Sequence, residues 1–114
     1  MDAYDLIIGI CAFNSRFRGE FYLRDLYQKI IDNASNIIVK GTGIRPHPFH
    51  NDSTKLHDAF YQLIRNGVFK QWVPGNYLTW NFPLSQREYF NERIKPGLKK
   101  EELKGLEALA ISMA

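Results

Sequence analysis

The sequence predicts a single α+β domain, and three observations lead to that prediction. The chain has 114 residues, which is the size of one domain and enough to bury a core without disulfide bonds. Hydrophobic residues make up 45% of the chain and charged residues 24%, a composition typical of globular and not of disordered proteins. Several segments place apolar residues at helical spacing, whereas residues 68–82 indicate two strands joined by a turn.

The first part of the chain is expected to form two helices and two short strands. Residues 4–13 are too continuously apolar for one amphipathic stripe, so this helix should bury more than one face. Residues 20–23 form a short β-like run, and residues 25–31 carry apolar side chains at helical spacing. The β-branched residues 37–39 predict a further strand, and the glycines and prolines of residues 40–49 predict a loop.

The clearest helix is expected over residues 53–66. Asp52 or Ser53 can cap its first turn, because their side chains accept from the free N–H groups there. Asn66-Gly67 should end it, since glycine readily takes the left-handed conformation. Its single apolar stripe consists of Leu56, Ala59, Phe60, Leu63 and Ile64.

After this helix the sequence predicts a β-hairpin and two more helices. The hairpin spans residues 68–82 around the turn Pro74-Gly75-Asn76. Residues 85–94 predict a short polar helix, which Pro96-Gly97 ends. Residues 99–113 predict a last helix, whose apolar side consists of Leu103, Leu106, Leu109, Ala110 and Met113. Residues 1–114 are therefore expected to form one domain, with a core at about 4–82 and a C-terminal helical extension at 83–114.

The order of these elements and two local patterns resemble the winged helix-turn-helix superfamily. One pattern is Leu56-x-x-Ala59-Phe60-x-x-Leu63-Ile64-x-x-Gly67-Val68-Phe69. The other, Phe21-x-Leu23-Arg24-Asp25-Leu26, is similar to the short strand that feeds the second helix. The resemblance implies a three-helix core with a β-hairpin wing. It departs from the usual pattern because about twenty residues separate Ile31 from Asp52, where a helix-turn-helix uses three or four.

The resemblance implies a DNA-binding protein, and specifically a small transcriptional regulator. Helix 53–66 would enter the major groove and hairpin 68–82 would flank it. Arginine and glutamine can hydrogen-bond base edges, while lysine and threonine more often hold phosphates. The residues expected to bind DNA are Thr54, Lys55, Tyr61, Gln62, Arg65, Lys70 and Arg45. Residues 40–80 hold five Lys and Arg against two carboxylates, so most of the net charge of +3 lies around these elements.

Two kinds of partner remain open, double-stranded DNA and another protein. A protein–protein interaction module on the same core, such as an adaptor, an antitoxin-like partner or a phage-type inhibitor, would also have modest charge and an aromatic hairpin. The arrangement of the cations separates the two. Convergence on one surface favours DNA, and scatter around exposed aromatic side chains favours a protein partner. These cations are Lys40, Arg45, Lys55, Arg65 and Lys70.

A homodimer is also expected to be possible, because winged helix regulators usually bind two DNA half-sites as dimers. The apolar surplus of helices 4–13 and 99–113 could form the dimer surface. Alternatively, these two helices could pack on each other within one chain.

No catalytic, metal or cofactor site is expected, and the chain is not expected to be an enzyme. Cys11 lies in an apolar run, where a thiol is normally protonated and inert. His47-x-x-His50 lacks the cysteine or carboxylate ligands that zinc sites usually add. No phosphate-binding glycine loop or Gly-x-Ser-x-Gly motif occurs. The acidic N-terminus is unlike a signal peptide, and no apolar stretch nears the roughly 20 residues that span a membrane, so a cytoplasmic location is expected.

Overall fold

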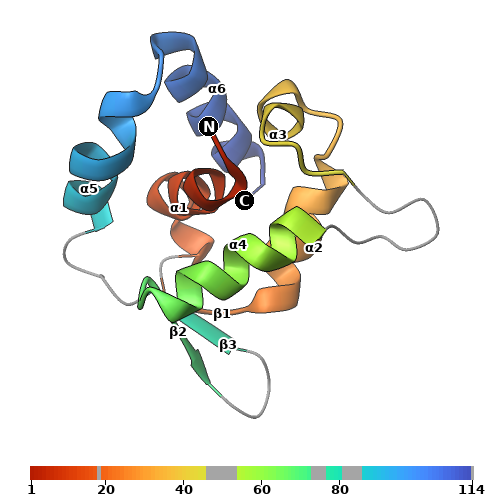
Figure 1. Cartoon of the computed structure of the whole chain (residues 1–114), viewed down its shortest axis with the longest axis vertical. Helices are drawn as coiled ribbons and strands as arrows, with labels where there is room; N and C mark the ends of the chain where they lie inside the picture. Colours follow the sequence, from red (N-terminus) through yellow and green to blue (C-terminus); the bar gives the residue numbers. More distant parts are fainter. Residues whose placement is uncertain (18, 46–53, 73–76, 81–85, 114) are drawn as a thin grey trace.

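In the computed structural model, the helix α1 (Ala3–Phe13) lies at the centre of the molecule and the other elements are arranged around it (Figure 1). Side chains are buried on all of its faces from Leu6 to Ala12, which confirms that this helix buries more than one face. The Asp2 carboxylate caps it by accepting from the Asp5 N–H at 2.8 Å. The structure describes residues 1–17, 19–45, 54–72, 77–80 and 86–113.

The helix α6 (Lys100–Ser112) packs along α1. Gly9 of α1 lies directly against the side chain of Leu106, so the absence of a Cβ allows the two helices to approach closely. The apolar side of α6 is buried at Leu106, Leu109 and Met113. The two helices that could have formed a homodimer surface therefore pack on each other within one chain.

Three short strands form one antiparallel sheet, which confirms the α+β class. The hairpin strands β2 (Phe69–Trp72) and β3 (Tyr77–Trp80) pair as expected, and β1 (Glu20–Tyr22) adds to the other edge of β3. The strand order is therefore β1-β3-β2, with Phe21 opposite Leu78. The predicted turn 74–76 lies outside the described residues.

Aromatic rings connect the sheet to the helices. Phe17, in the 3-10 turn Ser15–Phe17, meets Phe21 of β1 edge to face, with the ring centroids 5.2 Å apart. Phe21 in turn meets Phe69 of β2 at 5.7 Å. Phe69 stacks at 6.4 Å on Phe60 of the helix α4 (Thr54–Arg65), so these phenylalanines hold the sheet against α4.

The predicted strand at residues 37–39 is wrong, because these residues begin the helix α3 (Ile37–Gly41). The Asn36 side chain accepts from the Ile38 N–H at 2.9 Å and so caps the first turn. Val39 is buried in the core while Ile37 faces solvent. The local cap and the burial of one helical side outweigh the preference of β-branched residues for strands.

The remaining helices lie where the sequence predicts them. α2 (Leu23–Asp32) follows β1 directly. α4 buries Leu56, Ala59, Phe60 and Leu63, and Gly67 beyond its end has a φ of 76°. Asp52 and Ser53, its expected caps, lie outside the described residues.

The expected helix at residues 85–94 is divided into α5 (Gln86–Tyr89) and a π-helical turn (Phe90–Ile94), followed by the 3-10 turn Lys95–Gly97. Phe90 anchors this segment to α1 through an edge-to-face contact with Phe13, with centroids 5.3 Å apart. Within the described parts of the chain, no helix combines the length and the apolar run required to cross a membrane.

Candidate nucleic-acid interface

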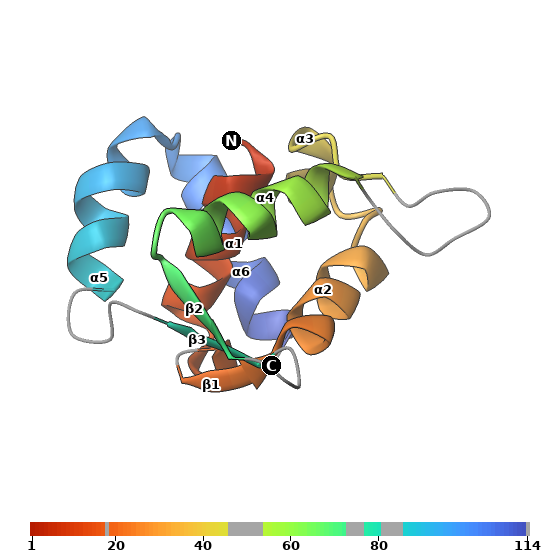
Figure 2. The ribbon, with the colours of Figure 1, turned by 60° about the horizontal axis from the view of Figure 1, so that its bottom comes forward.

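α4 crosses the front of the molecule and leads into the hairpin below it (Figure 1; the turned view in Figure 2 shows the same relation). At 3.6 residues per turn, the face opposite its buried stripe carries Thr54, Asp58, Tyr61 and Arg65. All four side chains are exposed, and Tyr61 is 65% exposed. Thr54, Tyr61 and Arg65, which were expected to bind DNA, therefore lie together on one outer face. Asp58, which was not, lies between them.

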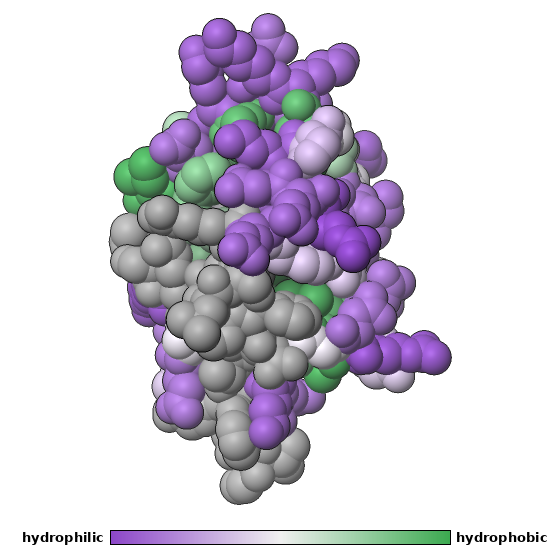
Figure 3. Space-filling view, turned by 90° about the vertical axis from the view of Figure 1, so that its left-hand side faces the viewer, coloured by the Kyte–Doolittle hydropathy of each residue, from purple (hydrophilic) through white to green (hydrophobic). Residues whose placement is uncertain are grey.

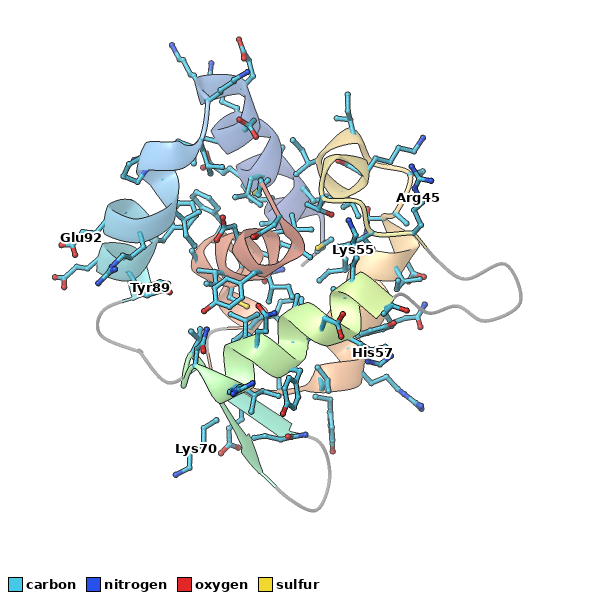
Figure 4. The ribbon with its side chains drawn as sticks, viewed as in Figure 1. Arg45, Lys55, His57, Lys70, Tyr89 and Glu92 are labelled. Atoms are coloured by element: carbon cyan, nitrogen blue, oxygen red, sulfur yellow. The ribbon has the colours of Figure 1, made fainter. Side chains whose placement is uncertain are left out.

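Lys55 and Gln62 lie on a flank of α4 and not on this outer face. They line a shallow hollow of about 200 Å³ together with Asp2 and Asp58. The Lys55 side chain also extends across Gly43, where an added Cβ would lie 2.5 Å from Nζ. Figure 4 shows Lys55 on the side of α4 that faces α3. Two expected DNA contacts are thus exposed on a flank of α4 that two carboxylates also border.

The opposite flank of α4 is closed by aromatic contacts with α2. The rings of Tyr27 and His57 have centroids 4.9 Å apart, and Tyr27 also lies 6.3 Å from Phe60. His57 points toward α2 in Figure 4. These contacts fix the position of α4 on α2, and the sequence alone did not indicate this role for Tyr27.

Arg45 and Lys70 are exposed at opposite ends of α4 (Figure 4). Lys70 lies on β2, beyond the last turn of α4. Arg45 and Lys40 line a hollow of about 640 Å³ beside the end of α2, which Asp32 also borders. The five cations of the central segment form two groups, with Lys40, Arg45 and Lys55 near the start of α4 and Arg65 and Lys70 near its end, so they do not all converge on one surface.

The outer face of α4 has no net charge, since Asp58 balances Arg65. Exposed carboxylates repel phosphates, whereas a carboxylate in the major groove can accept from the amino group of cytosine. This face is suited to reading bases by polar and aromatic contacts more than to holding the phosphate backbone. No family model, curated protein or solved structure matches this chain.

The other chemistries weighed from the sequence concern Cys11 and the histidines. Cys11 is fully buried in α1, which confirms that it is a core residue. Among the residues that the structure describes, no group of three or more His, Cys, Asp or Glu side chains is placed to hold a metal ion. His47 and His50 lie outside the described residues.

Proposed function

We propose that this chain is a winged helix DNA-binding domain and a small transcriptional regulator, with α4 as its recognition helix. The observation that carries the proposal is the order α1, β1, α2, α4, β2, β3 with a sheet order of β1-β3-β2. The resemblance rests on the same order of helices and strands, so this order supports the proposal. α3 and the segment after it are an insertion between the second helix and the recognition helix.

The proposed contacts follow from the outer face of α4. Arg65 would hydrogen-bond a guanine edge or a phosphate, and Tyr61 would pack on a sugar or a thymine methyl group. Thr54, in the first turn, would meet a phosphate near the positive end of the helix dipole. Asp58 would read cytosine, so it would contribute to specificity and reduce affinity for random sequences.

The flanking residues have lesser roles in this proposal. Lys70 on β2 and Arg45 beyond the start of α4 would reach phosphates on either side of the groove. Lys55 and Gln62 would contribute little, because they face the hollow that Asp2 and Asp58 border.

Fluorescence anisotropy with duplex DNA at several salt concentrations tests the proposal. The log–log salt slope counts phosphate contacts at about 0.9 for each. Arg65→Ala and Lys70→Ala are expected to weaken binding, and Lys70→Ala to reduce the slope by about one. Lys104→Ala, an exposed change on α6, is the matched control and should leave both quantities unchanged. Absence of binding at low salt would overturn the proposal.

A protein–protein interaction module is the second candidate, and the division of the cations between the two ends of α4 favours it. Tyr61 on α4 and Tyr22 on β1 are large exposed side chains. Aromatic side chains of this kind are enriched in protein interfaces. The same titration separates the two candidates, since this module would not bind DNA.

A further inference from the structure

The hollow beside the end of α2 has two cations on its rim and is here called the α2 hollow. It is lined by side chains from residues 31–35 and 40–45 and encloses about 640 Å³, a volume typical of sites for small ligands. The cations are Lys40 and Arg45, and both side chains are exposed. Among the residues that the structure describes, neither of them forms an ion pair. Both charges are therefore available to an anion that enters the hollow.

A tight turn between the two cations fixes the backbone that carries them. The Thr42 hydroxyl donates to the Val39 carbonyl at 2.6 Å and accepts from the Ile44 N–H at 3.4 Å. Gly43 has a φ of 81°, which lets the chain leave α3 in this turn. Val39 and Ile44, each next to one of the cations in the sequence, are buried in the core. Because this backbone is already ordered, binding of an anion would not have to order it.

The charge around the α2 hollow is positive although Asp32 belongs to its lining. The Asp32 carboxylate accepts from the side-chain amide of Gln28 at 2.8 Å, so part of its hydrogen-bonding capacity is used within α2. Lys55 extends across Gly43 and adds a third cation on the other side of the turn. One carboxylate thus stands against three cations in this part of the surface.

Polar character alone does not distinguish this place from the rest of the surface. The face that carries α5 is also mostly hydrophilic over its described atoms (Figure 3). Its exposed charges are of both signs, with Arg93 next to Glu92 in the sequence and Glu88 one turn before them. Arg45 lies on the α3 side of the molecule, far from α5 (Figure 4). The α2 hollow differs from the α5 face because its cations exceed its carboxylates.

We propose that the α2 hollow binds the terminal phosphate of a small organic phosphate about the size of a mononucleotide. A phosphate monoester carries a charge of about −1.5 to −2 at pH 7, which two cations can balance. Arg45 can bind phosphate through two parallel hydrogen bonds, and Lys40 can bind it as a point charge. The hydroxyl of Ser35, also on the lining, can donate a further hydrogen bond. The hollow is larger than one phosphate group, so it also has room for the organic part.

This site goes beyond the proposed function. Arg45 is also a proposed contact to DNA, but Lys40, Asp32 and Ser35 are not. Binding of a small phosphate is measured without DNA, so its failure and the failure of DNA binding are separate results.

Isothermal titration calorimetry of the full chain with adenosine monophosphate tests the site. This ligand is expected to bind, and adenosine, which lacks the phosphate, is not. Cyclic adenosine monophosphate should bind several-fold more weakly, because its phosphate is a diester with a single negative charge. No binding of adenosine monophosphate, or equal binding of adenosine, would overturn the proposal. Equal binding of the cyclic ligand would also overturn it and would point to a phosphodiester, as in a nucleic-acid backbone.

Single substitutions test whether the ligand lies in the α2 hollow. Lys40→Gln and Arg45→Gln are each expected to weaken binding of adenosine monophosphate by about tenfold, because each removes a charged hydrogen-bond donor. Asp32→Asn should strengthen binding several-fold, since it removes a like charge from the lining. Lys104→Gln, at an exposed position on α6, is the matched control and should leave the affinity unchanged. Equal weakening by Lys104→Gln, or unchanged affinity in the three hollow variants, would show that the ligand binds elsewhere.

Discussion

The side-chain amide of Asn14 donates a hydrogen bond of 3.0 Å to the carbonyl oxygen of Ala110 and so joins the end of α1 to the last turns of α6. Asn14 is only 3% exposed, and its Oδ1 accepts from the Arg16 N–H at 3.0 Å. One buried side chain thus connects the two central helices and directs the turn that leads to β1.

Asn14→Ala is expected to lower the free energy of unfolding by about 1–3 kcal/mol, because the Ala110 carbonyl would lose its side-chain donor in a buried setting. Urea denaturation measures the change. Asn91→Ala, at an exposed position, is the control and should have little effect. Equal effects of the two substitutions would contradict this role of Asn14.

Gly9→Ala is expected to destabilise the protein by about 1–3 kcal/mol, although alanine is the better helix former. The new Cβ would overlap Cδ2 of Leu106 and approach its Cγ and Cδ1 to 3.1 Å, and because Leu106 is fully buried, its side chain could shift only by disturbing the packing around it. Gly41→Ala is the matched control, since nothing lies within 4 Å of its added Cβ. Thermal unfolding that showed both variants to be at least as stable as wild type would contradict the close packing of α1 on α6.

Asp5→Asn is expected to change how stability depends on pH. Burial raises the pKa of the Asp5 carboxyl above its ordinary value of 3.8, and the nearby Asp2 carboxylate adds to this effect, while the N-terminal amine opposes it. The folded protein therefore keeps this proton at pH values where the unfolded chain has lost it. Stability attributable to Asp5 falls as the pH rises from the unfolded pKa through the folded pKa.

Urea denaturation from about pH 3.5 to about pH 7 measures this effect. Relative to wild type, Asp5→Asn should gain stability as the pH rises. A difference between Asp5→Asn and wild type that is the same at every pH would contradict the raised pKa.

Asp58→Asn is expected to increase affinity for random duplex DNA several-fold at low salt, because it removes a carboxylate from the outer face of α4. Fluorescence anisotropy measures the affinity, with Glu107→Gln on α6 as the charge-matched control. If the wild-type protein binds DNA and Asp58→Asn binds it with the same affinity, the DNA contact does not lie on the outer face of α4.

The elements with a single strong periodic signal were predictable from the sequence. The apolar stripe of α4 has only one way to be buried, and Gly67 has the positive φ that a helix end of this kind requires. The segment 37–39 was not predictable by the same reasoning. Its β-branched side chains favour a strand, and only the Asn36 cap and the nearby surface of α6 determine that it is helical.

The candidate site was predictable only in part. Helical periodicity identifies the exposed side of α4, but it does not say what lies beside each flank. Lys55 faces Asp2 and Gly43 because α4 packs across the start of α1, which is a contact between distant parts of the chain. The packing of α3 on α6 gave no sequence signal, since residues 37–39 were expected to form a strand.

NMR mapping of the DNA contact tests the central claim most directly. Backbone amide spectra of the full chain would be recorded during titration with a short duplex at low salt. If α4 is the recognition helix, the largest shifts will fall at residues 54–65 and 69–71, with α6 unchanged. An absence of shifts, or shifts confined to α3 and α6, would contradict the assignment of α4 as a DNA-reading helix.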